Sequence, residues 1–438
     1  MKKNKNRQQI FKTKFFLGFV LLAFGLAFYL LAPKLFSVSY QRGDLNNFIE
    51  EAKVGKALLL ASEDEVYLKT PVPLKSIYMT SCVASTPSFR NNLLDFLETT
   101  ELNSVIIDIK DFSGTLSFKP EDQKLLHAWE AARCGTLEMK DFIKELHSKN
   151  IYTIGRITVF QDPHMANLRP DLAVQKRSDG SIWKDFKGLS FTDPGSKEIW
   201  DYHIDISKEA RKIGFDELNF DYIRFPSDGP MKDIKFPISS ERPKPEVLED
   251  FFEYLDGALK DTGVILSADL FGMTTTNTDD LNIGQVLERA MPYFDYIAPM
   301  VYPSHYPPNW NNFANPNHYP YEVINISMKE AVRRATSATT PVKTKYNKPI
   351  MNKVAEFDSE RQATTTREVF SGLYDKPVYD ANIMRPWLQD FRYGGEYGPD
   401  AIKAQIQATY DAGLHSWMFW DPANRYESLR EVLKQGLP

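Results

Sequence analysis

Acidic side chains recur near the ends of several β-branched and aromatic segments of this 438-residue chain. In "ELNFDYIRFP" (217–226), Asp221 interrupts an apolar run that is typical of a buried strand. A buried carboxylate is unfavourable unless it is paired, hydrogen-bonded or used in chemistry. The polar residues that share this position near a segment's end are Asp108, Lys110, Asp111, Asp221, Arg224, Asp269, Gln389, Asp390 and Asp421. In a parallel barrel the carboxyl ends of the strands meet at one opening, so these side chains are expected to converge there.

Several carboxylates around one cleft are what glycoside hydrolysis requires. One acid protonates the leaving oxygen while an ionised carboxylate attacks the sugar or activates water. Crowded carboxylates repel each other, which raises the pKa of one and keeps it protonated near neutrality. We expect Asp221 to be the nucleophile or base and Asp269 the proton donor, with Asp390 as the substitute donor.

Aromatic and basic side chains near the same segment ends are suited to binding a sugar. A flat ring, such as that of Trp417 or of the tryptophans beside it, can cover the apolar face of a sugar, and basic groups can bond hydroxyls or steady the acids. The expected substrate-binding residues are Asp108, Lys110, Arg156, Arg224, Tyr302, Trp387, Gln389, Trp420 and Asp421.

Each of these residues also has a structural interpretation. Asp221 could form a salt bridge with Arg224, and Asp269 could make a structural hydrogen bond. Asp390 and Asp421 stand where strands become loops, so either could cap a turn. The tryptophans could belong to the core. The sequence leaves these alternatives open.

Eight segments have the composition of short buried strands, and amphipathic stretches separate them. They are "SIYMTSCVA" (76–84), "SVIIDIKDF" (104–112), "IYTIGRITVF" (151–160), "ELNFDYIRF" (217–225), "VILSADLFG" (264–272), "YIAPMVYP" (296–303), "IMRPWLQDF" (383–391) and "HSWMFWDP" (415–422). Such alternation indicates a parallel sheet covered on both faces, and eight units predict an α/β fold of the (β/α)8 TIM-barrel type. The alternative is an open doubly wound sheet, but no Gly-rich phosphate loop follows the first strand.

Two of the amphipathic stretches carry clear helix signals. In "TDPGSKEIWDYHIDISKEARKIG" (192–214), Asp193 is the expected N-cap, Pro194 occupies the first turn and Gly214 ends the helix. "DAIKAQIQATYDAG" (400–413) follows the same plan and ends at Gly413. The long connection at about 340–382 exceeds a minimal unit, and we interpret it as an insertion.

The N-terminus has the pattern of a membrane anchor. Residues 1–14 carry six basic and no acidic side chains, and residues 15–32 are uncharged. This length favours an uncleaved transmembrane helix over a cleaved signal peptide, which remains the alternative. The basic tail should stay cytoplasmic. We therefore expect a juxtamembrane spacer at 33–73 and an extracytoplasmic barrel at 74–438.

The composition limits the classes of partner, metal and cofactor that this chain can bind. Without the six basic residues of the tail, the formal net charge of −5 becomes −11, which argues against nucleic acid. Cys82 and Cys134 are the only cysteines, too few for an iron–sulfur cluster or a cysteine-based zinc site; they could form one disulfide or remain two thiols. The seven histidines form no His-x-His or His-Glu-x-x-His motif, so a metal-dependent hydrolase is not indicated. We expect no cofactor, and the oligomeric state is open.

Five motifs occur in a characteristic order: "FDYIRFP" (220–226), "SADLFG" (267–272), "DYIAPMVYPSHY" (295–306), "RPWLQDF" (385–391) and "WMFWDPANRY" (417–426). Together they resemble a bacterial glycoside hydrolase family, a barrel domain originally catalogued as being of unknown function. The resemblance runs from about Lys75 to the C-terminus and implies a (β/α)8 fold in which Asp221 matches the primary carboxylate. By analogy with more distant barrels, the partner is Asp269, where a Glu is commoner. The segment before the seventh strand looks longer than the family's usual connection.

These observations lead to one main expectation and one alternative. The main expectation is a membrane-anchored, outward-facing glycoside hydrolase that acts on an extracellular or cell-envelope polysaccharide. The alternative is a non-catalytic carbohydrate-binding barrel at the cell surface.

Overall fold

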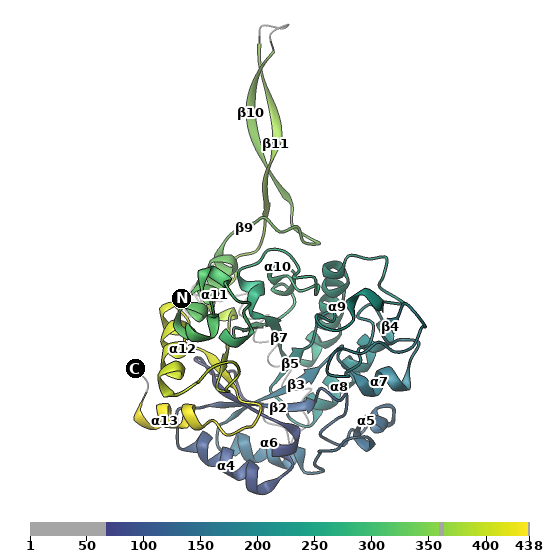
Figure 1. The fold of residues 1–438 in the computed structure, drawn as a ribbon, viewed down its shortest axis with the longest axis vertical. Coiled ribbons are helices and arrows are strands. Elements are labelled where there is room, and N and C mark those ends of the chain that lie inside the picture. Colours follow the sequence, from purple (N-terminus) through teal and green to yellow (C-terminus); the bar gives the residue numbers. More distant parts are fainter. Residues whose placement is uncertain (1–66, 359–362, 437–438) are drawn as a thin grey trace, which may run out of the picture. The chain divides into compact units, whose positions relative to one another are not determined.

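The computed structural model describes residues 67–358 and 363–436, and its centre is a closed barrel of eight parallel strands (Figure 1). Each of the eight predicted segments supplies one strand, so the (β/α)8 prediction is confirmed. In order around the barrel the strands are β1 (Lys75–Met79), β13 (Trp417–Trp420), β12 (Trp387–Gln389), β8 (Tyr296–Met300), β7 (Ile265–Phe271), β5 (Glu217–Asp221), β3 (Tyr152–Thr158) and β2 (Ser104–Lys110).

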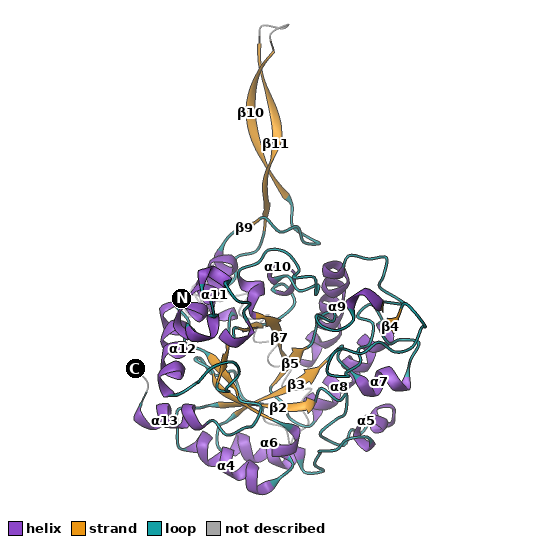
Figure 2. Cartoon of the chain, viewed as in Figure 1, coloured by secondary structure: helices purple, strands orange, loops and turns teal. Residues whose placement is uncertain are grey.

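One main helix follows each barrel strand, and these helices surround the strands (Figure 2). In chain order they are α4 (Pro87–Glu98), α6 (Met139–Ser148), α8 (Lys197–Lys212), α9 (Lys244–Leu259), α10 (Leu287–Ala290), α11 (Pro320–Thr336), α12 (Pro399–Asp411) and α13 (Glu427–Gln435). Among the described residues, three further short α-helices lie in the loops: α3 (Ser81–Ala84), α5 (Leu126–Glu130) and α7 (Pro163–Leu168). The 3-10 helices are η1 (Gln123–Leu125), η2 (Met231–Asp233), η3 (Lys260–Thr262), η4 (Gly272–Thr275), η5 (Pro303–His305), η6 (Trp310–Asn312), η7 (Pro316–His318) and η8 (Ala381–Ile383).

Alternating side chains of the strands serve two different cores. In β5, Leu218 and Phe220 belong to the large apolar core that also includes the surrounding helices. Glu217, Asn219 and Asp221 make their contacts with polar groups of other barrel strands. Because successive side chains of a strand point to opposite faces, this alternation directs the acids into the barrel. The apolar run in the sequence therefore conceals one polar face.

Helix α8 starts later than its sequence predicts. The expected cap, Asp193, instead accepts hydrogen bonds from the backbone N–H groups of Gly195, Ile238 and Ser239. Ser196 is the N-cap, and its hydroxyl accepts from the N–H of Ile199. The prediction of Asp193 as N-cap was wrong because the intervening residues form a turn that its carboxylate stabilises. The predicted ends are confirmed, since Gly214 and Gly413 have φ angles of 115° and 84° just beyond α8 and α12.

A short segment before β1 closes the amino-terminal end of the barrel. Leu74 is fully buried within the inner core, and Leu68 packs against the same cluster. The N–H of Leu68 donates to Asp216, and the hydroxyl of Thr70 lies 3.0 Å from that of Tyr152. These contacts make residues 67–74 part of the barrel.

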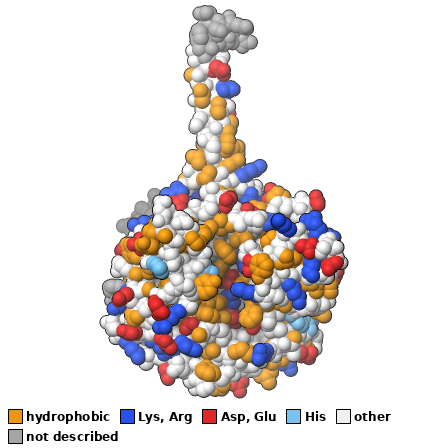
Figure 3. All heavy atoms as spheres, viewed as in Figure 1, with side chains coloured by type: hydrophobic (Ala, Val, Ile, Leu, Met, Phe, Trp, Pro, Cys, Tyr) orange, Lys and Arg blue, Asp and Glu red, His pale blue; other side chains and the backbone are white. Residues whose placement is uncertain are grey.

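The long connection between α11 and β12 contains a β-hairpin that stands away from the barrel (Figure 1). It consists of β10 (Pro349–Asp358) and β11 (Ala363–Asp375), and at its base β11 pairs with β9 (Thr339–Thr340). Figure 3 shows hydrophobic side chains along its length. Met351 and Val354 of β10 and Phe370 of β11 are exposed. A smaller sheet of β4 (Gln175–Lys176) and β6 (Ile234–Lys235) joins the loops after β3 and β5.

Cys82 and Cys134 form a disulfide, with Cα atoms 4.8 Å apart. It links α3, which follows β1, to the connection between β2 and α6. The predicted transmembrane helix at 15–32 and the basic tail lie outside the described residues. Within the described ranges, every helix is too short or too polar to cross a bilayer.

Candidate active site

Arg156 is the centre of the acidic cluster. It lies in the middle of β3, and its guanidinium is nearly buried. One nitrogen donates to Asp108 at 2.6 Å, a second donates to Asp221, and Nε lies 3.8 Å from Asp269. Three carboxylates from three other strands therefore share one cation. Asp221 is paired with Arg156 and not with Arg224, and the N–H of Tyr222 donates to its second oxygen at 2.5 Å.

Asp269 is the most enclosed of these acids. Oδ1 accepts a hydrogen bond from the Asn219 amide at 2.8 Å and from the Trp387 indole at 2.7 Å. Among the described residues, no donor reaches Oδ2. Burial, and after it the charge of Asp221, raises the pKa of Asp269 well above its ordinary value. The Nε of Arg156 lies 3.8 Å from Oδ2, beyond hydrogen-bond distance.

Asp108 completes the cluster together with two aromatic rings. The hydroxyl of Tyr78 donates to this carboxylate, and the Tyr78 ring stacks on Trp420 with 3.9 Å between centroids. The Arg156 guanidinium lies 4.9 Å from the centre of the Trp420 ring, within cation–π range. Burial raises the pKa of Asp108 to about 6, although Arg156 opposes the shift. Asp221 remains the most accessible of the three acids, with 7% of its side chain exposed against 4% for Asp108 and 1% for Asp269.

Tyr302 joins the cluster from the loop after β8, and Trp387 joins it from β12. Burial, followed by the charges of Asp269 and Asp221, raises the pKa of the Tyr302 hydroxyl. Both rings belong to the inner core, and Trp420 packs against it. These three aromatic residues, which the sequence offers as sugar platforms, therefore surround the acids as part of the barrel interior.

Two basic residues of the predicted set lie outside the cluster. Lys110 is fully buried, donates to the carbonyl of Thr158 and pairs with Asp162 at 2.8 Å. Arg224 donates to the carbonyl of Phe225 and the hydroxyl of Ser227. Both make local contacts that hold loops at the carboxyl end of the barrel.

Asp390 and Asp421 face the C-terminal helix instead of Arg156. Asp390 accepts from the N–H of Leu429 in α13, and burial raises its pKa to about 7. Asp421 accepts from the N–H groups of Ala423, Arg425 and Tyr426, which is the turn-capping arrangement.

Gln389 and Trp417 are buried and make contacts that stabilise the fold. Gln389 is fully buried, and its side chain bonds Ser304 and the carbonyl of Phe391. Trp417 is also fully buried and belongs to the outer core beneath the helices.

Sequence analysis missed two residues of the cluster, Tyr78 and Asn219. Asn219 precedes Asp221 by two residues and pairs with Arg156 in the ladder. Tyr78 pairs with Ile106, which precedes Asp108 by two residues. The period of two along the strand was the available signal.

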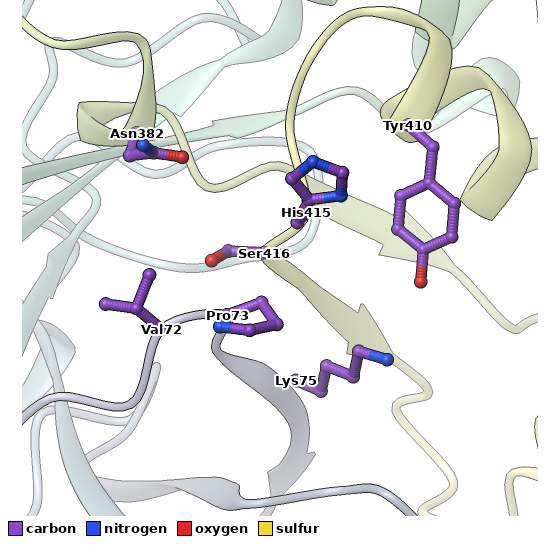
Figure 4. A pocket seen from close by; sticks show the side chains of 7 residues that line it. All are labelled: Val72, Pro73, Lys75, Asn382, Tyr410, His415 and Ser416. Atoms are coloured by element: carbon purple, nitrogen blue, oxygen red, sulfur yellow. The ribbon is translucent and has the colours of Figure 1, made fainter.

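A cavity of about 370 Å³ lies at the other end of the barrel (Figure 4). Lys75 begins β1 and Ser416 precedes β13, so this cavity adjoins the amino ends of the strands, whereas the acids adjoin the carboxyl ends. Its lining residues are Val72, Pro73, Lys75, Asn382, Tyr410, His415 and Ser416. Within residues 67–358 and 363–436, no group of three or more His, Cys, Asp or Glu side chains is arranged to hold a metal ion.

A protein-family model with the description "Putative glycosyl hydrolase domain" matches residues 76–365 and 353–426. No curated protein matches this chain.

Several solved structures are similar. A hypothetical protein from Ruminiclostridium thermocellum ATCC 27405 is 34% identical over 44% of this chain and 96% of its own, with a TM-score of 0.40. The PgaB (BpsB) glycoside hydrolase domain from Bordetella bronchiseptica is 13% identical over 82% of this chain and 98% of its own, with a TM-score of 0.50. Alpha-L-fucosidase isoenzyme 2 from Paenibacillus thiaminolyticus is 12% identical over 82% of this chain and 49% of its own, with a TM-score of 0.51. At such identities the last two show the fold alone.

Proposed function

This chain belongs to the glycosyl hydrolase family whose model spans its barrel, and from that premise we propose that it cleaves a polysaccharide with Asp221 and Asp269. The observation that carries this assignment is the position of Arg156, which contacts both acids at once. Two carboxyl groups held on one cation lie close enough to act on one glycosidic bond, which is the requirement of this chemistry.

The environments of the two acids fit different roles. Asp269 has a raised pKa, and no hydrogen-bond donor of the described part of the chain reaches its Oδ2, so we assign it as the acid that protonates the leaving oxygen. Asp221 is the more exposed of the two and is the partner in the ion pair, so it acts as a carboxylate. It either attacks the anomeric carbon or takes a proton from the attacking water. In both routes the glycosidic C–O bond breaks and the proton of Asp269 passes to the departing sugar.

Asp390 receives no catalytic role in this proposal. Its pKa of about 7 would suit a general acid, but its carboxylate faces α13 and lacks a contact with Arg156. A suitable pKa without a suitable position does not make a proton donor.

We further propose that the barrel is held outside the cytoplasm by the N-terminal segment. Residues 15–32 have the length and composition of a membrane-spanning helix, and a basic segment precedes them. The Cys82–Cys134 disulfide supports this placement, because such bonds persist mainly in oxidising compartments.

The test is the release of reducing ends from a panel of barley β-glucan, xylan, glycol chitosan and purified peptidoglycan. Asp221→Asn and Asp269→Asn are expected to lower kcat by at least about a hundredfold on the polymer that the wild type cuts. Asp390→Asn is the matched control and should keep its activity. If the wild type binds a polymer but cuts none, the chain is a carbohydrate-binding barrel and the catalytic proposal fails.

A further inference from the structure

Four aromatic side chains form a continuous series from the acidic cluster to the rim of the barrel. They are Tyr302, His305, Phe391 and Tyr393, and we call them the aromatic track. Tyr302 and His305 come from the loop after β8, and Phe391 and Tyr393 from the loop after β12. Neighbouring ring centroids are 5.3 to 6.0 Å apart.

The exposure of the rings increases outward along the track. Tyr302 is 6% exposed and lies beside the acids, whereas Tyr393 is 65% exposed. His305 is open to water, yet enough protein surrounds its imidazole for desolvation, followed by the charge of Lys187, to lower its pKa. Grouped aromatic rings that reach the surface are typical of a ligand-binding site.

Hydrogen bonds order the backbone of the loops that carry the outer rings. The Asn317 amide donates to the carbonyl of Tyr393 at 2.8 Å, and the buried Tyr397 donates to the carbonyl of Asn317. Gln389 joins the two loops, since it accepts from Ser304 and donates to Phe391. These hydrogen bonds order the backbone from which the outer rings project, which lowers the entropy that binding must overcome.

The opposite wall comes from the loop after β3. In the ring of eight strands β3 stands directly opposite β12. A turn stabilised by Asp185 presents Phe186, which is 79% exposed, and the adjacent Lys187 is near enough to influence the pKa of His305. The loop that carries the exposed Phe186 therefore approaches the aromatic track at His305.

We propose that the aromatic track binds successive sugar units of a polysaccharide, beyond the units that flank the scissile bond. This inference rests on the proposed function, and it deepens it by assigning the residues that hold the sugar units of the polymer away from the bond that is cut. The exposed rings pack against the apolar C–H faces of the sugars. Nδ1 of His305 lies 3.0 Å from the hydroxyl of Ser304, so Nε2 is the nitrogen that would bond a sugar hydroxyl.

The decisive variant is Tyr393→Ala, because this side chain is largely exposed and its loss should leave the fold intact. On the polymer from the panel, we expect KM to rise about tenfold with little change in kcat, and no change on the shortest oligosaccharide that is cut. Tyr393→Phe keeps the ring and should therefore have the wild-type KM. Tyr346→Ala is the matched control, since Tyr346 is 63% exposed and lies in the connection between β9 and β10.

Binding is measured separately in the Asp221→Asn protein by retardation in native gels that contain barley β-glucan, xylan or glycol chitosan. Adding Tyr393→Ala should weaken retardation about tenfold. If Asp221→Asn still cuts but Tyr393→Ala abolishes retardation, the track stands and the catalytic assignment falls. If Tyr393→Ala leaves polymer binding and KM unchanged, or impairs long and short substrates equally, the track proposal is overturned.

Discussion

The indole Nε1 of Trp387 donates a 2.7 Å hydrogen bond to Oδ1 of Asp269. This contact joins β12 to β7 across the interior of the barrel. A donor to a carboxylate favours its charged form, so the indole opposes the burial that raises the pKa of Asp269.

Trp387→Phe should therefore raise the pKa of Asp269 further. Because the acid must be protonated to act, the basic limb of the kcat/KM profile should move to higher pH, by about one unit. The measurement is the pH–rate profile on the polymer that the wild type cuts. Trp417→Phe, at an equally buried strand position in the outer core, is the control and should lower stability without moving this limb. A limb that moves to lower pH would contradict the role of Asp269.

Arg156→Met should destabilise the protein by about 3–5 kcal/mol at pH 8, since it leaves buried carboxylates without a counter-ion. The loss should be smaller at pH 5. Burial raises the pKa of Asp108 to about 6, so below that pH this group is neutral and needs no cation. Urea unfolding at the two pH values measures the difference, and an equal loss at both would show that the guanidinium acts mainly through packing.

Asp390→Asn should stabilise the protein in alkaline solution. The folded protein holds the Asp390 proton up to a pKa of about 7, whereas the unfolded chain releases it near 4, so stability falls as pH rises between these values. The amide keeps an acceptor for the N–H of Leu429 and never ionises. Relative to the wild type, the variant should gain about 2–3 kcal/mol between pH 5 and pH 8. Thermal melts across this range test it; a pH-independent difference would argue against a buried, titrating Asp390.

Reduction of the Cys82–Cys134 disulfide should lower the free energy of unfolding by about 3–4 kcal/mol. The bond closes a loop with a sequence separation of 52, and the estimate follows from the chain entropy that it removes from the unfolded state. Urea unfolding with and without dithiothreitol measures the effect. The Cys82→Ser, Cys134→Ser double variant serves as the control, because it should match the reduced protein and be indifferent to the reductant.

The strands and the convergence of acids were predictable because both follow from periodicity and from the geometry of a parallel barrel. The sequence predicts Asp221, Asp269, Asp108 and Arg156 near one another, and the structure brings them together. The ion-pair partner of Asp221 was not predictable from the sequence. Arg224 is three residues from Asp221 in sequence, whereas Arg156 reaches it through strand pairing.

Loop conformation was beyond the reach of the sequence pattern. The backbone carbonyl of Tyr393 accepts a hydrogen bond from the Asn317 amide, and the adjacent Gly394 has a φ angle of 69°. Neither feature has a periodic signature. The sequence predicted only an insertion at about 340–382. In the structure, β10 and β11 of the insertion pair as an antiparallel ladder.

The residues before β1 cover the amino-terminal end of the barrel interior. Their packing determines where a stable fragment of the domain can begin. The family match starts at residue 76, but Leu68 and Leu74 fill the interior beneath the first layer of side chains. A fragment that starts at residue 76 would leave that layer open to water, whereas one that retains Tyr67 onward keeps it sealed. Recombinant fragments should therefore be designed from the packing and not from the family boundary, and the longer fragment should melt at a clearly higher temperature.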